Sequence, residues 1–278
     1  MTHIWSVFTK AWSALPAEEL GPLVAGLGFT GAEVPVRENT RVTPADAEER
    51  LPGFVERMRA EGVDVISVAA DLAEPTFAAC ASAGVPLIRI MAGLGPDGYA
   101  ASVARVREQL EEAAPLTERY GVQVGVQPHH GRFVSSALGV AQLLDGLPVD
   151  RFRVVWDAGH DALAGDDPRV TLELVADRLA IVNLKNGVYT RSDGGWRHWW
   201  VPGPEGMADW AAAFAELARL GWTGPVCLSG EYSDKGVPVE DRLRADLRAA
   251  QEAAGPLHGG RLVATGPPAP RRSTLRER

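Results

Sequence analysis

Two short apolar runs of this chain end in side chains that could perform acid–base or metal chemistry. Val154–Trp156 leads directly into Asp157, and His160 follows three residues later. Val226–Leu228 is followed, after a short turn, by Glu231. A carboxylate at the carboxyl end of a buried strand can bind a divalent metal, and a partly enclosed one can act as a general base. The alternatives are an aspartate that caps the next helix and a solvated loop glutamate.

A third apolar run delivers an amide and two histidines. Val124–Val126 runs into Gln127, and His129 and His130 follow a proline. An amide oxygen coordinates a hard cation more weakly than a carboxylate does. His129 is therefore the better candidate for a ligand or a general acid or base. We interpret His130 as a surface-loop residue.

A fourth run, Ile181–Val182, leads to Asn183 and Lys185. These two side chains share one side of a strand because side chains alternate along it. At the mouth of a barrel, Lys185 could hold a substrate oxygen or stabilise an enolate. A buried lysine paired with a structural carboxylate is the equally weighted alternative.

Further charged and aromatic candidates for substrate binding are Arg37, Arg89 and Trp196. Arg89 stands inside an apolar run, so its side chain must face the barrel lumen or meet a partner. We expect Glu33 to form a structural ion pair with Arg37 or Arg89. Trp196 could stack on a sugar ring, or it could pack within a hairpin or against a second subunit.

Composition limits the classes of protein that this chain could be. It has 278 residues, of which 46% are hydrophobic, enough for one large core. The net charge of −8, without a long basic run, argues against binding nucleic acid through phosphates. Only two cysteines are present, which we expect to be buried thiols in a reducing compartment.

No membrane or export segment is recognisable in the sequence. The first residues lack a basic stretch followed by a long apolar one, and no run reaches the roughly 20 apolar residues of a membrane span. We expect a cytoplasmic protein with no membrane or nucleic-acid partner. The exposed aromatic residues near the C-terminal third are compatible with a homodimer.

Apolar runs alternate with amphipathic stretches along most of the chain, which indicates parallel strands joined by helices. We expect strands at Ile4–Phe8, Gly31–Pro35, Val63–Ala69, Pro86–Met91, Val122–Gln127, Phe152–Trp156, Leu179–Leu184 and Val226–Leu228. Helices are expected near 16–27, 44–61, 75–83, 98–119, 135–146, 168–177, 207–220 and 238–253. Eight strands and eight helices predict a single (β/α)8 barrel over residues 1–256. The competing doubly wound sheet usually carries a glycine-rich phosphate turn, and none is found here.

Two regions depart from the alternation. Residues 187–206 form a long insertion with a hairpin turn at Asp193-Gly194 and aromatic residues beside it. Residues 257–278 are rich in proline and arginine, and we expect a disordered tail.

These motifs resemble the sugar phosphate isomerase/epimerase superfamily, which has the xylose isomerase-like barrel. The resemblance covers about residues 4–253. It lies in Val7–Lys10, Gly28–Glu33, Asp157–His160, Leu184–Asn186, Gly206–Trp210 and Glu231–Tyr232. It implies isomerase, epimerase or lyase chemistry on sugar-like compounds.

The resemblance also implies one divalent metal (Mn²⁺, Mg²⁺, Co²⁺ or Zn²⁺), held by Glu, Asp, His and Glu at the ends of strands five to eight. By position these ligands correspond to Gln127, Asp157, Asn183 and Glu231, of which only Asp157 and Glu231 keep the family's residue type. His160 matches a histidine that contacts substrate.

The sequence therefore supports three hypotheses. The first is a metal-assisted isomerase or epimerase that works through an enediolate, with Glu231 or His129 moving the proton and Lys185 orienting oxygens. The second is a lyase or dehydratase acting on a keto-sugar or a glycosylated natural product, which needs one base and one acid. The third is a barrel that binds a sugar without catalysis.

Overall fold

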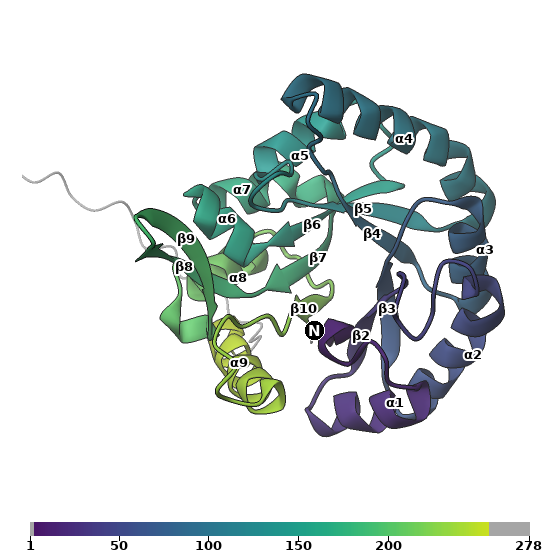
Figure 1. Ribbon diagram of the computed structural model, residues 1–278, viewed down its shortest axis with the longest axis horizontal. Coiled ribbons are helices and arrows are strands. Elements are labelled where there is room, and N and C mark those ends of the chain that lie inside the picture. Colours follow the sequence, from purple (N-terminus) through teal and green to yellow (C-terminus); the bar gives the residue numbers. More distant parts are fainter. Residues whose placement is uncertain (1–2, 256–278) are drawn as a thin grey trace, which may run out of the picture.

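Eight parallel strands close into a barrel, as the sequence predicts (Figure 1). The computed structural model describes residues 3–255. The strands are β1 (Trp5–Phe8), β2 (Gly31–Pro35), β3 (Asp64–Ala69), β4 (Leu87–Met91), β5 (Gln123–Gln127), β6 (Phe152–Asp157), β7 (Leu179–Leu184) and β10 (Val226–Leu228). Parallel pairing of β1 with both β2 and β10 closes the ring.

Helices surround the barrel (Figure 1). They are α1 (Ala17–Gly26), α2 (Ala47–Ala60), α3 (Glu74–Ala83), α4 (Tyr99–Tyr120), α5 (Ala137–Leu143), α6 (Ala158–Ala164), α7 (Pro168–Val175), α8 (Trp210–Arg219) and α9 (Val239–Ala254). The bounds agree with the predicted ones to within a few residues, except at α6. That short helix was not expected, because it begins directly at the end of β6 with no turn residues between them.

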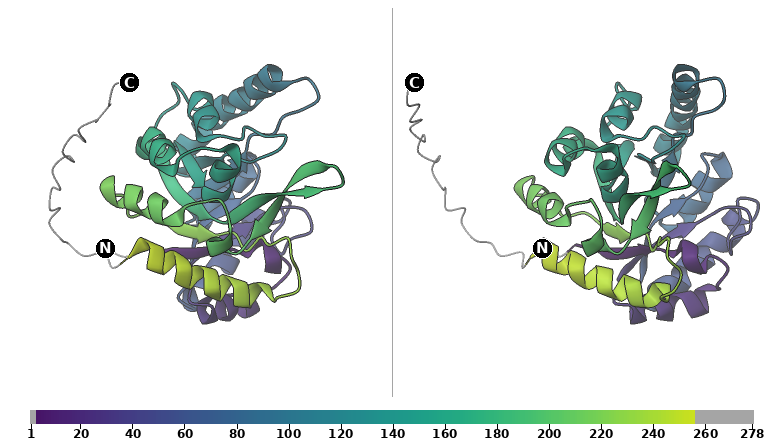
Figure 2. Two further views of the ribbon diagram at one scale, coloured as in Figure 1. Left: turned by 90° about the vertical axis from the view of Figure 1, so that its left-hand side faces the viewer. Right: turned by 60° about the vertical axis from the view of Figure 1, so that its left-hand side comes forward.

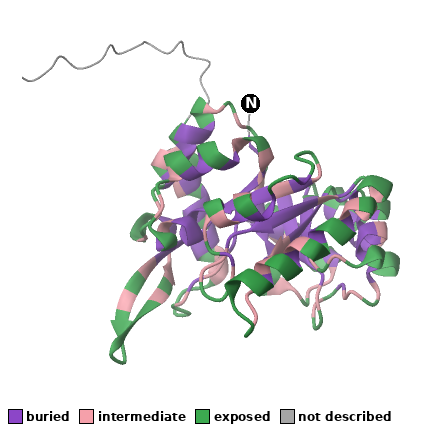
Figure 3. Ribbon diagram, turned by 90° about the horizontal axis from the view of Figure 1, so that it is seen from above, coloured by how far each residue is buried: buried purple, intermediate pink, exposed green. Residues whose placement is uncertain are grey.

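Side-chain alternation divides each strand between two apolar layers. In β1, Val7 joins the large core between strands and helices, whereas Phe8 joins a smaller cluster inside the barrel. In β6, Val154 points outward and Val155 inward in the same way. The strands are therefore almost entirely buried, as Figure 3 shows in purple. This alternation decides which polar side chains reach the lumen.

The expected insertion is an antiparallel hairpin of β8 (Asn186–Ser192) and β9 (Gly195–Val201), which projects from the barrel (Figure 2). Its turn is at Asp193-Gly194, where φ is 50° and 79°. Two consecutive positive φ values are typical of the two-residue turns that match strand twist. The predicted turn is thus confirmed.

Two other expectations can be compared with the structure, and a third falls outside it. Cys80 and Cys227 are both buried free thiols, as predicted. No helix of the described part, residues 3–255, is long and apolar enough to cross a membrane. The tail predicted at 257–278 lies outside the described residues.

Candidate active site

The carboxyl ends of the strands surround a small polar cavity of about 50 Å³. It is lined by Phe8, Lys10, Arg37, Arg89, Met91, Gln127, His129, Asn183, Lys185, Ser229 and Glu231. Most of these residues are inward-facing positions at or just beyond strand ends. Strand-end placement in a closed barrel thus brings together side chains that lie far apart in the sequence.

Glu231 lies between two lysines. Lys10 Nζ donates to its Oε1 at 2.7 Å, and Lys185 Nζ donates to its Oε2 at 3.2 Å. Burial alone would raise the pKa of Glu231, but the charges and hydrogen bonds of the two lysines lower it to about 2. Glu231 is therefore a carboxylate at neutral pH.

The Lys185 ammonium occupies the centre of this polar group. Only 5% of its side chain is exposed, and Nζ lies 3.7 Å from Asp157 Oδ2 as well as 3.2 Å from Glu231. Nζ also lies 4.6 Å from the ring centroid of Trp200, which reaches the site from β9. One cation thus faces two carboxylates and an aromatic ring. Both roles considered for this lysine, an ion-pair partner and a donor to substrate, are compatible with this position.

Asp157 both caps α6 and belongs to the buried polar network. Its Oδ1 accepts from the backbone N–H of His160 at 3.0 Å, the contact typical of a helix N-cap. Its Oδ2 accepts from Gln127 Nε2 at 2.6 Å. The capping alternative raised for Asp157 is therefore confirmed, and it occurs together with the contact to Gln127.

The packing around Gly159 explains why the third residue of the Asp-Ala-Gly-His sequence is a glycine. A Cβ at this position would lie 2.8 Å from Lys185 Cγ and 3.2 Å from Trp200 Cζ3. Only glycine leaves room for the first turn of α6 to approach Lys185 so closely.

Arg89 and Glu33 form the buried ion pair expected from the sequence. Arg89 Nε lies 2.8 and 2.9 Å from the two carboxylate oxygens of Glu33, and a further contact runs from Nη2. Ser67 Oγ also donates to Glu33, at 3.0 Å. Arg89 Nη1 donates to Gln127 Oε1 at 2.6 Å, which fixes the orientation of the amide.

Three of the four positions that the resemblance assigns to a divalent metal are committed to other contacts. Asp157 and Glu231 accept from protein donors on both of their oxygens. Gln127 directs its oxygen toward Arg89 and its NH₂ group toward Asp157. Only Asn183 has a buried oxygen without a partner among the described residues. As they lie, these side chains do not fit a divalent ion, and their ligand role stays a prediction.

A group of histidines lies next to this network. One ring nitrogen from each of His129, His130 and His160 lies within 4.8 Å of the other two, so the group could bind a metal. His130 Nδ1 is 3.2 Å from His160 Nδ1, and His130 Nε2 is 3.0 Å from Nδ1 of His198 on β9. His130 was expected on a surface loop, but the hairpin covers it.

These histidines are neutral at physiological pH. Burial, followed by the charges of neighbouring histidines and Lys185, lowers the pKa of His130 to about 4. Burial is also the main cause that lowers the pKa of His129, His160 and His198. His160 Nδ1 accepts from the backbone N–H of His130 at 3.3 Å, so Nε2 carries its proton, and that buried Nε2 has no partner among the described residues.

The remaining candidate residues are distributed unevenly. Arg37 lines the cavity, whereas Trp196 is 69% exposed near the hairpin turn and is not brought to the site. Trp200 on the same strand approaches Lys185 instead.

Lys10 and His198 were not singled out from the sequence, because a lone lysine after a first strand and a histidine in an insertion carry no local signal. Period-two alternation from Trp200 would have placed His198 on the same hairpin face.

A closed parallel barrel with a polar cavity at the carboxyl ends of its strands is the arrangement in which barrel enzymes carry their sites. Residues 22–253 match the xylose isomerase-like TIM barrel family, and the chain belongs to that family. The superfamily expected from the sequence is thereby confirmed.

Individual relatives are distant. An inosose dehydratase from Geobacillus kaustophilus is 26% identical over 165 residues, which cover 51% of this chain and 53% of the relative. The chain thus spans about half the length of the curated relatives it matches. A xylose isomerase domain protein from Planctomyces limnophilus superimposes with a TM-score of 0.73 at 14% identity, covering 91% of this chain and 98% of that one. For a 3-keto-D-glucoside 4-epimerase from E. coli the TM-score is 0.69 at 15% identity, covering 90% and 99%. At such identities the structural likeness concerns the fold.

Proposed function

We propose that this chain is an isomerase or epimerase that moves a proton at the carbon beside a carbonyl group of a sugar or sugar-like polyol. The observation that carries the proposal is the pairing of Lys185 with Glu231 in the strand-end cavity. An ammonium group can stabilise the enediolate oxygen that forms when the neighbouring carbon loses its proton. Glu231, ionised at neutral pH, is the base for that proton.

Substrate binding would change the contacts of Lys185. A carbonyl oxygen that accepts from Nζ competes with Glu231 for the same donor, so the pKa of the carboxylate rises as the ammonium turns to the substrate. A carboxylate with a pKa of about 2 is a weak base, and release from one lysine makes it a stronger one. Lys185 thus exchanges Glu231 for the substrate oxygen during the reaction, and Glu231 becomes free to accept the substrate proton. Lys10 keeps Glu231 in place.

The relatives agree with this class of chemistry. One of them is named a dehydratase and another an epimerase of 3-keto-D-glucosides. Elimination of water and inversion of a carbon can both begin with loss of a proton beside a carbonyl. The shared first step, rather than either product, is what the comparison supports for this chain.

Elimination is the second candidate reaction, and one feature of the cavity favours it. Glu231 is the only carboxylate among the residues that line the cavity, because Gln127 stands where the family has a glutamate. A lyase or dehydratase needs one base and one acid, and Lys10, whose ammonium donates to Glu231, could supply the acid. A symmetric pair of carboxylates is not required.

A divalent metal is the cofactor that the resemblance implies. We assign no step of the reaction to it, because the strand-end side chains hold one another in place of an ion. His129, His130 and His160 are the described residues that could bind one near the cavity.

The experiment is to incubate the purified protein with a panel of keto-sugars and keto-glycosides and to analyse the products by mass spectrometry and NMR. An isomer of unchanged mass supports the leading proposal, and loss of water or of an aglycone supports elimination. Binding without any product, under conditions in which the protein is folded, would contradict both and leave a sugar-binding barrel.

A further inference from the structure

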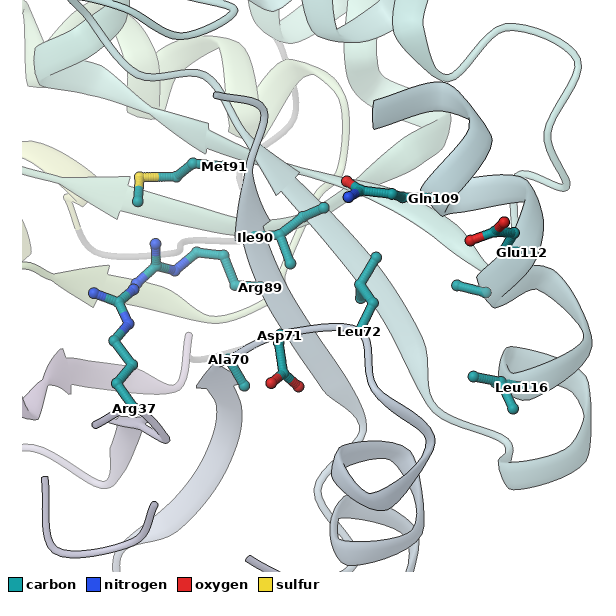
Figure 4. A pocket seen from close by; sticks show the side chains of 11 residues that line it. Arg37, Ala70, Asp71, Leu72, Arg89, Ile90, Met91, Gln109, Glu112 and Leu116 are labelled. Carbon is teal, nitrogen blue, oxygen red and sulfur yellow. The ribbon is translucent and has the colours of Figure 1, made fainter. Parts of the chain in front are cut away.

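A larger cavity of about 600 Å³ adjoins the strand-end cavity (Figure 4). It lies between the carboxyl ends of β3 and β4 and the helix α4. Arg37, Arg89 and Met91 line both cavities, so the two meet at these side chains. Small-molecule sites usually measure about 300–1,000 Å³, a range that includes the larger cavity but not the strand-end one. The larger cavity therefore has room for the part of a ligand that the strand-end cavity cannot hold.

We call this larger cavity the groove at α4. Two of its sides are largely aliphatic. Ala70, Leu72, Ile90, Met91, Ala113 and Leu116 supply aliphatic surface, Asp71 and Glu112 supply carboxylates, and Gln109 supplies an amide. Figure 4 shows Ile90 and Leu72 near the middle of the groove, and Leu116 on α4 at its far side. A flat apolar group could bury surface there, whereas a free sugar would leave this surface without a complementary partner.

Arg37 stands at the junction of the two cavities, half-buried and without a side-chain partner. Its guanidinium makes no hydrogen bond or ion pair with any residue of the described range 3–255, whereas that of Arg89 is taken up by Glu33 and Gln127. Figure 4 shows the two guanidinium groups next to each other. A half-buried cation beside a second one is costly unless an anion joins it. The Arg37 guanidinium suits a carboxylate or an acidic hydroxyl group of a ligand.

We propose that this groove binds the non-reacting part of a two-part substrate, an aryl glycoside whose aglycone carries a carboxylate or an acidic phenol. The sugar ring faces Lys185 and Glu231, the aryl group lies against Leu72 and Leu116, and its anionic group pairs with Arg37. The inference rests on the proposed function for the reacting end and adds the class of substrate.

Direct binding tests the groove without requiring turnover. The probes are glucose, phenyl β-D-glucoside and 4-carboxyphenyl β-D-glucoside, with dissociation constants measured by calorimetry. We expect affinity to rise at least tenfold from glucose to the phenyl compound and again to the carboxyphenyl compound. Equal affinity for the three, or no binding of the two aryl glucosides at millimolar concentration, would overturn the inference.

Two substitutions, Leu116→Trp and Arg37→Met, test where the probes bind. Leu116→Trp should fill the groove and weaken both aryl glucosides at least tenfold while leaving glucose unchanged. Leu174→Trp is the matched control on the exposed face of α7 and should bind all three probes like the parent protein. Arg37→Met should abolish only the preference for the carboxylated probe, and it keeps the test valid if Leu116→Trp does not fold. Retention of that preference in Arg37→Met would contradict the assigned role.

The groove and the reaction can fail independently. Binding of the aryl glucosides with the expected pattern, together with no turnover of any keto-glycoside, would contradict the proposed function and leave the groove assignment standing. Turnover of free keto-sugars with no effect of Leu116→Trp would do the reverse.

Discussion

At the scale of single residues, Lys185 places a buried ammonium group at the strand ends, where the resemblance implies a divalent metal. Its ammonium faces Asp157 and Glu231 at 3.7 and 3.2 Å, and it lies above Trp200. A buried cation with two carboxylates is neutralised in the ground state and can donate to an oxyanion as it forms. The charge needed for enolate chemistry is thus available from the chain itself.

Replacing Lys185 tests this role. Lys185→Met should lower kcat/KM by about 10²–10³, the loss typical of removing one donor to a developing oxyanion. The loss should fall mainly on kcat, because the contact strengthens in the transition state. Steady-state kinetics on the best substrate measures kcat and kcat/KM. Lys10→Met is the matched control, which also removes one lysine from Glu231, and it should cost less. Equal losses in the two variants would contradict a special role for Lys185.

A second residue-scale prediction concerns stability rather than activity. Asp161 is buried, its Oδ2 accepts from Thr171 at 2.7 Å, and its Oδ1 has no partner among the described residues. Burial raises its pKa to about 7 from 3.8. The unfolded chain loses this proton first, so stability falls as pH rises from about 4 to about 7.

Asp161→Asn removes that titration. The variant should gain stability relative to the parent as pH rises, by on the order of 1 kcal/mol or more at pH 8, with a smaller difference at pH 4. Urea unfolding at both pH values measures the change. A stability difference independent of pH would show that the Asp161 carboxyl is not perturbed in the folded protein.

At the scale of elements, the approach of α6 to the end of β7 creates the site. Asp157 begins the helix, and Gly159 lets its first turn lie against Lys185. Sequence reasoning identified Asp157 and His160 from their place after a strand. It did not predict α6, because a seven-residue helix has too few turns for a periodic apolar pattern. Nor could it predict that β9 would place Trp200 over Lys185, since the register of a hairpin relative to the barrel is a tertiary property.

Gly159→Ala should therefore displace Lys185. We expect at least a tenfold loss of kcat/KM, because the new methyl group would lie within about 3 Å of Lys185 and Trp200. The matched control is Gly26→Ala in α1, where a Cβ meets no atom within 4 Å. That change should keep activity and stabilise the helix slightly. Kinetics and thermal unfolding of both variants provide the comparison. Full activity of Gly159→Ala would contradict the close packing.

The histidine group makes a prediction about metals. Imidazole nitrogens prefer Zn²⁺, Co²⁺, Ni²⁺ or Cu²⁺ over Mn²⁺ and Mg²⁺. Protein loaded with Co²⁺ or Zn²⁺ should lose the ion in His130→Ala and keep it in Asp157→Asn. Metal analysis after gel filtration measures the content. Loss of the ion in Asp157→Asn alone would instead place the metal at the strand ends and contradict the mutual pairing of those side chains.

At the scale of the whole molecule, the barrel could be predicted almost completely. Eight apolar runs such as Leu179–Leu184, separated by helices and without a glycine-rich phosphate turn, favour a closed barrel over a doubly wound sheet. Alternation then places Gln127, Asp157 and Asn183 in the lumen. The partners of these side chains could not be predicted, because whether Gln127 faces a metal or links Arg89 to Asp157 depends on rotamers that no local pattern specifies. The groove at α4 could not be predicted either, because its walls come from the ends of β3 and β4 and from α4 together.

Deuterium wash-in shows directly whether the protein removes a proton from the carbon beside a carbonyl group. The protein is incubated with keto-sugars and keto-glycosides in D₂O, and deuterium at the carbon beside the carbonyl is followed by NMR. We predict enzyme-dependent exchange that disappears in Glu231→Gln and falls strongly in Lys185→Met, whether the final product is an isomer or an alkene. Exchange that persists in Glu231→Gln, or a product formed by the parent protein with no deuterium incorporated from solvent, would contradict it.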